Sequence, residues 1–315
     1  MLDLKRLTIF HEVSRQSSFS AAAQVLSYSQ PAISHHISRL EHELGVRLLE
    51  RSNRGEVRLT EAGELLLAYT EDLLATVQDA EAAVAELAHG RARLIRLGAF
   101  ATGASTILTD AIARLRSEII GIQLVFSEGD APELLRALKA RQLDLALVFD
   151  DPNHPLVRED ELEYHYLYDD PMLLALPREH RLAAKPVIRM DELATEAWIK
   201  GAADDTPCSL ILSLAGARAG FEPQIVLNSG NYEIVQRLTA AGIGVAMIPE
   251  LALTSPDAGI VLRRLEPEPW RRVVLALHRT AYRSPSVEAL IHEIIQTCDR
   301  YTRNRDERVS AIAAA

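Results

Sequence analysis

The chain has 315 residues, of which 48% are hydrophobic and 25% charged; this is ordinary globular composition and excludes wholesale disorder. Its length allows two or three domains. With 34 Lys and Arg against 44 Asp and Glu, the formal net charge is −10, which at first argues against nucleic-acid binding.

Targeting signals and cysteines point to a cytoplasmic protein. No apolar run approaches the ~18 residues of a membrane span, and the first residues do not form a secretory signal. We therefore expect no membrane partner. The two cysteines, Cys208 and Cys298, cannot build a disulfide framework and fit a reducing compartment.

The first sixty residues predict three short helices. Apolar residues at three-residue steps indicate the first helix: Leu4, Leu7, Phe10 and Val13. Ser20 is the expected N-cap of a second helix over 21–26, and Ser29 of a third, with Pro31 in its first turn. One buried stripe is expected along the third helix, which Gly45 ends: Ile33, Ile37, Leu40 and Leu44.

The opposite face of the third helix carries polar and charged side chains. With the preceding turn it presents side chains of the kinds that contact base edges or phosphates: Tyr28, Ser29, Gln30, Pro31, Ser34, His35, Ser38 and Arg39. Two helices joined by a three-residue turn predict a helix-turn-helix. On this pattern alone, the alternative is a small helical bundle with a solvated face.

A β-hairpin is predicted directly after this helix. Two short alternating segments, 46–51 and 57–60, flank a polar turn. Arg51 and Arg54 lie at and beside its tip, where they can reach a DNA backbone or a narrow minor groove. The alternative is a solubilising surface hairpin, which its place after the candidate recognition helix makes weaker.

These motifs carry a family resemblance. The stretch SQPAISHHISRLEHELGVRLLER at 29–51, followed by LTEAGELL at 59–66, resembles the LysR-type transcriptional regulators. The resemblance implies a winged helix-turn-helix that reads interrupted inverted repeats near promoters as a homodimer or homotetramer. It implies as partners double-stranded promoter DNA, a small-molecule effector and RNA polymerase.

This chain departs from the family pattern at two places. His35 and His36 stand where Arg or Gln is common, which can alter the base preference. Leu49 replaces a usual Phe, which should only repack the wing.

Residues 61–88 contain no Pro and predict one long helix. Its candidate dimer seam alternates four and three apart over about three heptads: Leu66, Thr70, Leu73, Val77, Ala80, Val84 and Leu87. A helix with such a stripe needs a partner, so we expect pairing with its copy in another subunit. Packing against its own domain is the alternative.

Beyond residue 91 strands and helices alternate, which predicts parallel sheets with ligands at the carboxyl ends of strands. The first set has strands at 94–99, 122–127 and 143–149 and helices at 105–116 and 131–140. The second has strands at 171–177, 198–200, 224–227 and 244–249, before a return strand at 272–277 and a helix from 286 to about 300. Two such lobes predict a cleft that closes on a small molecule.

The resemblance extends into this part. The stretches 143–147, 219–223 and 240–249 resemble the family's effector domain, itself similar to type 2 periplasmic binding proteins. We expect an α+β multidomain chain: a winged helix-turn-helix DNA-binding domain at 1–60 and a linker helix at 61–90. A two-lobed α/β effector domain follows at 91–301, with its second lobe at about 166–266, and then a tail at 302–315.

Polar and aromatic residues at strand ends form the predicted effector site. Thr102 and Ser105 open a helix, where hydroxyls and free N–H groups suit an anion. The full set of candidates is Thr102, Ser105, Glu128, Phe149, Lys200, Cys208, Asn228 and Asn231. The resemblance implies that Thr102 and the turns near Lys200 and Asn228 line the effector pocket. Taken singly, each polar residue is equally well explained as a helix cap.

Cys208 occupies the second position of a predicted helix N-terminus, where a thiolate is stabilised. It falls where the peroxide-sensing branch of the family has a reactive cysteine. The second cysteine of that branch, nine residues on, is Ala217 here. We therefore expect no disulfide switch of that type; a pocket-lining role is favoured, and a lone thiol sensor is the alternative.

Enzyme signatures are missing. Nucleotide-binding glycine loops, a nucleophile elbow and a zinc-protease motif do not occur, and the ten histidines have no metal-ligand spacing. We expect no enzyme, no cofactor and no metal. The pairs Asp150-Asp151 and Asp169-Asp170 are interpreted as hydrated turns.

The predicted function is a cytoplasmic transcription regulator controlled by an effector bound between two lobes. The alternatives are a thiol-based redox regulator using Cys208 and a cytosolic solute-binding protein. Residues 1–63 carry eight Lys and Arg against seven Asp and Glu, whereas residues 64–90 carry none against six. The overall acidity thus leaves the DNA-facing part slightly positive, and specific binding should depend on oligomer avidity.

Overall fold

A computed structural model describes residues 2–51, 57–89, 94–118, 122–151, 155, 158–201, 207–305 and 307. For some of these, among them Arg51, Cys208 and most of 82–89, it describes the backbone alone. The chain divides into two units, Met1–Gly90 and Arg91–Ala315, and each is described by itself.

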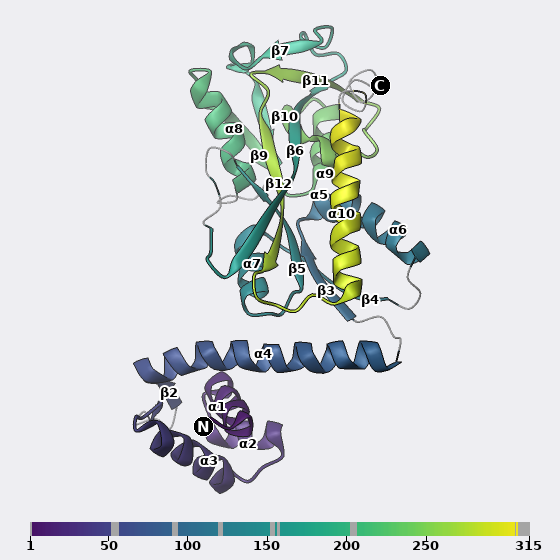
Figure 1. The fold of residues 1–315 in the computed structure, drawn as a ribbon. Coiled ribbons are helices and arrows are strands. Elements are labelled where there is room, and N and C mark those ends of the chain that lie inside the picture. The colour runs from purple at the N-terminus through teal and green to yellow at the C-terminus, as the bar shows by residue number, and fades with distance from the viewer. Residues whose placement is uncertain are drawn as a thin grey trace. The chain divides into compact units, whose positions relative to one another are not determined.

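The N-terminal unit is helical apart from one hairpin (Figure 1). Its elements are α1 (Leu4–Gln16), α2 (Phe19–Leu26), α3 (Gln30–Leu44), β1 (Leu49–Arg51), β2 (Val57–Leu59) and α4 (Glu61–His89).

Local capping chemistry sets the bounds of the three short helices. The Ser29 hydroxyl accepts a hydrogen bond from the Ala32 amide at 3.4 Å, and Gly45 ends α3 at φ 70°, as predicted. The prediction for α2 was wrong by two residues. Ser18, not Ser20, is its N-cap and accepts from the Ala21 amide at 3.3 Å.

One apolar cluster joins α1, α2, α3 and the hairpin, with Phe10, Ile33 and Leu40 fully buried. Leu44 was predicted to continue the α3 stripe but is 38% exposed. Residues 46–48 are not part of a strand, contrary to the predicted segment 46–51. Leu48 is nevertheless buried, because its side chain belongs to the apolar cluster of this unit.

The C-terminal unit contains two strand-rich lobes. Its strands are β3 (Leu94–Ala99), β4 (Gln123–Glu128), β5 (Leu145–Asp150), β6 (Leu162–Pro177), β7 (Val187–Arg189), β8 (Ala197–Lys200), β9 (Gln224–Asn228), β10 (Val245–Pro249), β11 (Ile260–Glu266) and β12 (Trp270–His278). Its helices are α5 (Ala101–Gly103), η1 (Ala104–Leu108), α6 (Thr109–Glu118), α7 (Ala131–Lys139), η2 (Met190–Leu193), α8 (Pro207–Arg218), α9 (Tyr232–Ala240), η3 (Glu250–Ala252) and α10 (Pro285–Arg303).

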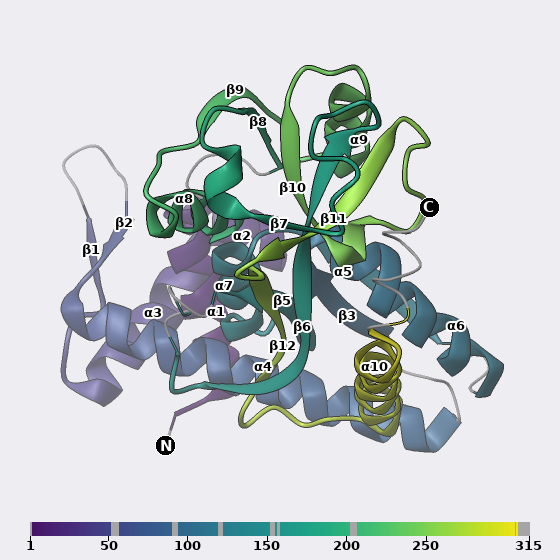
Figure 2. The ribbon, with the colours of Figure 1, turned by 90° about the horizontal axis from the view of Figure 1, so that it is seen from above.

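Two long antiparallel strands, β6 and β12, connect the lobes (Figure 2). The strand order is β4-β3-β5-β12-β6-β10-β8-β9, with β11 paired to β6. The first lobe pairs β3 in parallel with β4 and β5, and the second pairs β8 in parallel with β9 and β10. The sequence prediction began the middle strand at Pro171, but β6 starts at Leu162. Its first half was missed because Glu163, His165 and Tyr166 interrupt the apolar pattern.

Helices cover both faces of the sheet in each lobe. In β5, Leu145, Leu147 and Phe149 pack into the cluster under η1, α6 and α10, whereas Ala146 and Val148 face α7. A strand buried on both faces explains the unbroken apolar run that the sequence shows there. In the second lobe, α8 and α9 cover opposite faces in the same way. Among the described residues, no helix is long and apolar enough to cross a membrane.

A substitution at Gly63 can test how tightly the hairpin packs on the first turn of α4. A Cβ at Gly63 would lie 2.1 Å from the Leu48 carbonyl oxygen. Helix propensity alone favours Gly63→Ala by about 1 kcal/mol, but this backbone contact cannot yield. We expect the substitution to destabilise the protein by about 2 kcal/mol, measured by urea unfolding followed by circular dichroism.

The exposed Ala68→Gly on the same helix is the matched control, and it should cost about 1 kcal/mol through propensity. A Gly63→Ala protein as stable as the parent would contradict the close packing of this junction.

Candidate functional site

Helix α3 turns its polar face to solvent. Gln30, Pro31, His35, Ser38 and Arg39 are exposed, and Ser34 is half-buried. The apolar residues of the same helix anchor it to the core, so the orientation of this face is set by packing. Arg39 lies 3.6 Å from the Glu43 carboxylate, a surface pair that leaves its guanidinium accessible.

A second cation lies beside the N-terminal end of α3. The Lys5 ammonium lies 5.3 Å from the centre of the Tyr28 ring, and that ring meets His36 edge-on at 6.1 Å. Burial, and then the charge of Lys5, lowers the pKa of His36, so this ring is neutral at pH 7. The sequence analysis missed Lys5 because it belongs to α1, and only folding brings it next to Tyr28.

The carboxylate of Glu41 fixes the hairpin against α3. Its Oε1 accepts hydrogen bonds from the amides of Leu48 and Leu49, at 2.8 and 3.2 Å. The prediction that Arg51 and Arg54 lie at the hairpin tip concerns side chains outside the described residues. What the structure describes is the base of a wing that is tied to the candidate recognition helix.

The candidate seam on α4 divides into two parts. Leu66 packs against the core of its own unit and Thr70 is fully buried. Leu73 and Val84 are 46% and 65% exposed, Ala80 is exposed and Val77 is half-buried. The Leu87 side chain lies outside the described residues. The intramolecular alternative therefore holds for the first turns of the helix, and apolar side chains remain accessible further along it.

In the C-terminal unit, one buried arginine contacts several residues at the point where the lobes meet. The guanidinium carbon of Arg271 lies 4.9 Å from the ring centres of both Phe100 and Phe149. Its Nε donates to Asp170 at 2.8 Å and its Nη2 donates to the Thr102 hydroxyl at 2.5 Å. Arg271 is 2% exposed and Asp170 is fully buried. Two of the predicted effector residues, Thr102 and Phe149, therefore meet at this point.

The same junction reaches the second lobe through η3. The Leu251 amide donates to the other Asp170 oxygen at 3.1 Å. The Tyr168 hydroxyl donates to Glu250, and both of these residues are buried.

The interpretation of the aspartate pairs as hydrated turns was wrong for three of the four residues. Asp150 and Asp151 are 2% and 1% exposed, and Asp170 is fully buried. Asp150 lies 3.2 Å from the Arg158 guanidinium, and Asp170 lies 2.8 Å from that of Arg271. Only Asp169 keeps substantial exposure, near Arg272.

Among the other predicted effector residues, Ser105 joins the junction through Thr102, whereas Asn231 serves as a helix cap. Asn231 caps α9, because its side chain accepts from the Glu233 and Ile234 amides at 2.9 and 3.3 Å. Ser105 donates to the Thr102 carbonyl oxygen at 3.2 Å, and Glu128 ends β4 with an exposed side chain. Lys200 and Asn228 end neighbouring parallel strands and stand opposite each other.

The backbone after Thr102 has a feature that the sequence did not reveal. Residues Ala104–Leu108 form a π-helical turn where a regular helix from 105 was expected. The Thr106 and Thr109 hydroxyls donate to carbonyl oxygens one turn earlier, at 2.6 and 2.8 Å. Such turns occur frequently at functional sites.

Of the two cysteines, Cys298 is the one whose side chain the structure describes. The Cys208 side chain lies outside the described residues, so the thiol-sensor alternative stays a prediction. Cys298 is buried in the first lobe, and burial raises the pKa of its thiol to about 12. It is therefore an unreactive thiol at neutral pH. In the described part of the chain, no group of three His, Cys, Asp or Glu side chains could hold a metal ion.

Comparison with known protein families gives two matches. Residues 4–64 match the family described as bacterial regulatory helix-turn-helix protein, lysR family. Residues 88–299 match the family described as LysR substrate binding domain.

Individual relatives are similar over most of the chain. The HTH-type transcriptional regulator AlsR of Bacillus subtilis is 26% identical over 306 residues, covering 97% of this chain and 98% of AlsR. The HTH-type transcriptional regulator YnfL of Escherichia coli is 31% identical over 257 residues, covering 79% and 82%. A full-length OxyR variant from Pseudomonas aeruginosa shares the fold, with a TM-score of 0.68 at 24% identity, covering 93% and 95%.

The buried ion pair at the lobe junction predicts an asymmetric response to substitution. Arg271→Met leaves the fully buried Asp170 without its cation and should cost about 3–5 kcal/mol. Adding Asp170→Asn should recover much of that loss. Arg272→Met, beside the half-exposed pair with Asp169, is the control and should cost less than about 1 kcal/mol. Urea unfolding of the full chain measures all four proteins, and equal losses in the two single arginine variants would refute the assignment.

Proposed function

Because the chain belongs to the LysR family and is a DNA-binding transcriptional regulator, we propose how its parts divide that work. The exposed face of α3 and the wing bind promoter DNA, and α4 joins copies of the chain into a homo-oligomer. A small-molecule effector bound between the lobes of the C-terminal unit controls DNA binding. The observation that carries this proposal is the polar face of α3, held outward by its own buried stripe.

The chemistry of α3 supports base and phosphate contacts. Gln30 and Ser34 lie in the first turns, where a recognition helix meets base edges. Their amide and hydroxyl groups can donate and accept hydrogen bonds in a major groove. Lys5 and Arg39 are exposed cations at either side of this segment and suit backbone phosphates.

Exposed apolar side chains support the homo-oligomer. On α4, Leu65 and Tyr69 are each 63% exposed, beside the exposed Leu73. In the C-terminal unit the strands at the two ends of the main strand order also carry large apolar side chains: Val125 and Phe126 on β4, and Ile225 and Val226 on β9. Apolar edge strands of this kind promote pairing with another chain.

The lobe junction supports an anionic effector. The short helix α5 begins after Phe100 and carries Thr102 in its first turn, beside the Arg271 guanidinium. Helix N-terminal amides favour negative charge, although the charge of Arg271 itself is already matched by the buried Asp170. Lys200, at the end of β8 in the second lobe, adds a further cation. A ligand that contacts both lobes would change their relative placement.

DNA recognition is tested with the double substitution Gln30→Ala and Ser34→Ala. Loss of base contacts should weaken binding to the promoter region of the protein's own gene by about 10- to 100-fold. Fluorescence anisotropy measures the affinity, and binding to unrelated DNA should change little. Gln78→Ala, exposed on α4, is the control. Unchanged specific binding by the double variant would rule out α3 as the recognition helix.

The oligomer is tested with Leu73→Asp. In a lone chain this exposed position should tolerate the change within about 0.5 kcal/mol, but a charge inside a helix pair should separate the subunits. Light scattering coupled to gel filtration measures the mass. Gln78→Asp places the same charge on another exposed side of α4 and should leave the mass unchanged. The helix-pairing proposal fails if Leu73→Asp also leaves it unchanged.

A further inference from the structure

A cavity of about 670 Å³ lies in the second lobe, separate from the predicted effector residues. Its walls come from η2, α8 and the connection between β11 and β12. They include Met190, Ile211, Leu214, Ala215 and Trp270. The volume is within the range of small-molecule sites, roughly 300–1,000 Å³.

The inner wall of this cavity is apolar and belongs to the packed core. Met190 and Ile211 are 3% and 5% exposed and belong to the core of the second lobe. Trp270 is half-buried and follows Pro269 at the start of β12. Apolar side chains that are held by a packed core offer a preformed surface for an apolar ligand.

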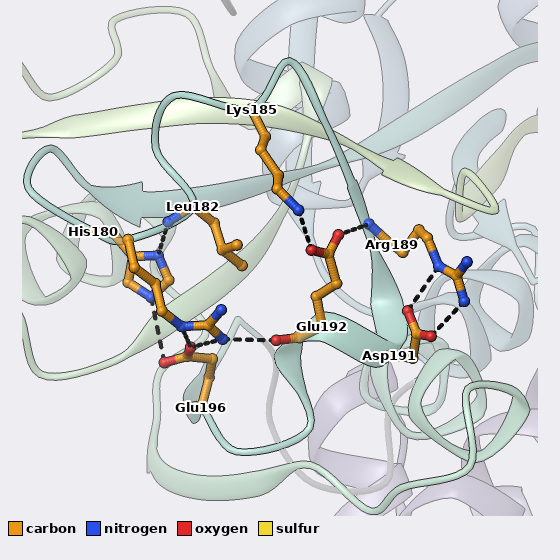
Figure 3. Close-up of polar contacts among 8 residues, drawn as sticks. His180, Leu182, Lys185, Arg189, Asp191, Glu192 and Glu196 are labelled. Atoms are coloured by element: carbon orange, nitrogen blue, oxygen red, sulfur yellow. Dashed lines mark hydrogen bonds and ion pairs between the residues drawn. The ribbon is translucent and has the colours of Figure 1, made fainter.

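The rim carries five charged side chains, and most are already paired. Arg189 binds Asp191 through Nε at 3.0 Å and through Nη2 at 2.5 Å, as the close-up of this wall shows (Figure 3). Beside this pair, the Glu192 carboxylate binds Lys185, so the outer wall is tied together by ion pairs. Glu268 lies 2.5 Å from the Arg305 guanidinium.

Glu266 is the exception on the rim. It is exposed, and within the described part of the chain its side chain makes no hydrogen bond or ion pair. Its backbone stands opposite Arg189 in the parallel pairing of β11 with β7. Its negative charge also contributes, after those of Asp191 and Glu192, to raising the pKa of Arg189. Asp191 and Glu268 are each paired with an arginine, which leaves Glu266 as the rim carboxylate without a side-chain partner in the described part of the chain.

We propose that this cavity binds a small organic cation, a primary amine with an apolar or aromatic body. The body lies on Trp270, Ile211 and Leu214, and the ammonium group meets the carboxylate of Glu266. A carboxylate ligand is disfavoured in this pose, because it would bring a like charge next to Glu266. This site goes beyond the proposed anionic effector site, since the two differ in place and in ligand charge.

The test uses the full-length protein with 2-phenylethylamine as the probe and phenylacetate as its anionic counterpart. Titration calorimetry gives the affinity, and tryptophan fluorescence reports contact, because Trp270 lines the cavity whereas Trp198 is fully buried. We expect saturable binding of the amine with a change in fluorescence, and binding of phenylacetate at least fivefold weaker. No saturable amine binding, or equal binding of both probes, would overturn the proposal.

Two substitutions with matched controls test whether the amine binds in this cavity. Glu266→Gln should weaken amine binding about fivefold, the equivalent of about 1 kcal/mol for an exposed ion pair. Glu222→Gln, exposed elsewhere in the second lobe, should leave it unchanged. Ala215→Phe fills the cavity and should weaken binding more than tenfold, whereas Ala217→Phe on the exposed side of α8 should not. Because Ala215→Phe can disturb α8, the rim substitution tests the site without altering the core. Parental affinity in Glu266→Gln would overturn the assignment.

Discussion

The burial of the Arg271 guanidinium is the constraint on which the C-terminal unit depends. A buried cation is tolerated only if its hydrogen-bond donors are used, and Arg271 meets this demand with Asp170 and Thr102 while two phenylalanine rings cover its faces. Asp170 in turn accepts the Leu251 amide from η3. One ion pair therefore connects the first helix of the first lobe, both crossing strands and the end of β10. Any change in the relative placement of the lobes has to preserve or rearrange these contacts.

A comparable constraint organises the N-terminal unit, although here it acts through the backbone. The Glu41 carboxylate holds the chain between α3 and β1. The Thr60 amide donates to the Leu48 carbonyl oxygen at 3.0 Å, and the Thr60 hydroxyl accepts from the Gly63 amide at 3.0 Å. The candidate recognition helix, the wing and the first turn of α4 thus meet around Leu48. The proposed pairing helix α4 is in this way coupled through the backbone to the proposed DNA-binding face of α3.

Charge is unevenly distributed within the N-terminal unit. Residues 1–63 are close to neutral, and residues 64–90 are acidic. Arg39 belongs to α3, and folding brings the Lys5 cation from α1 next to Tyr28 at the start of that helix. With so few cations per copy, the proposed DNA binding should be weak for a single chain. In the proposed homo-oligomer, later contacts would be intramolecular, which raises the effective affinity.

The sequence by itself determined the parts of this protein that depend on local pattern. The buried stripe of α3, its Ser29 and Gly45 caps, the unbroken apolar run of β5 and the matching LysR-type motifs each follow from neighbouring residues. Patterns of this kind also predicted Thr102 and Phe149 as candidate site residues.

Only the tertiary structure decided which distant residues meet. The burial of Asp150, Asp151 and Asp170, the contact of Lys5 with Tyr28, and the cavity beside Trp270 are examples. An aspartate pair looks the same in a sequence whether water or an arginine from a strand a hundred residues later surrounds it. Burial and ion pairing depend on strand crossing, and strand crossing is not a property of any local segment.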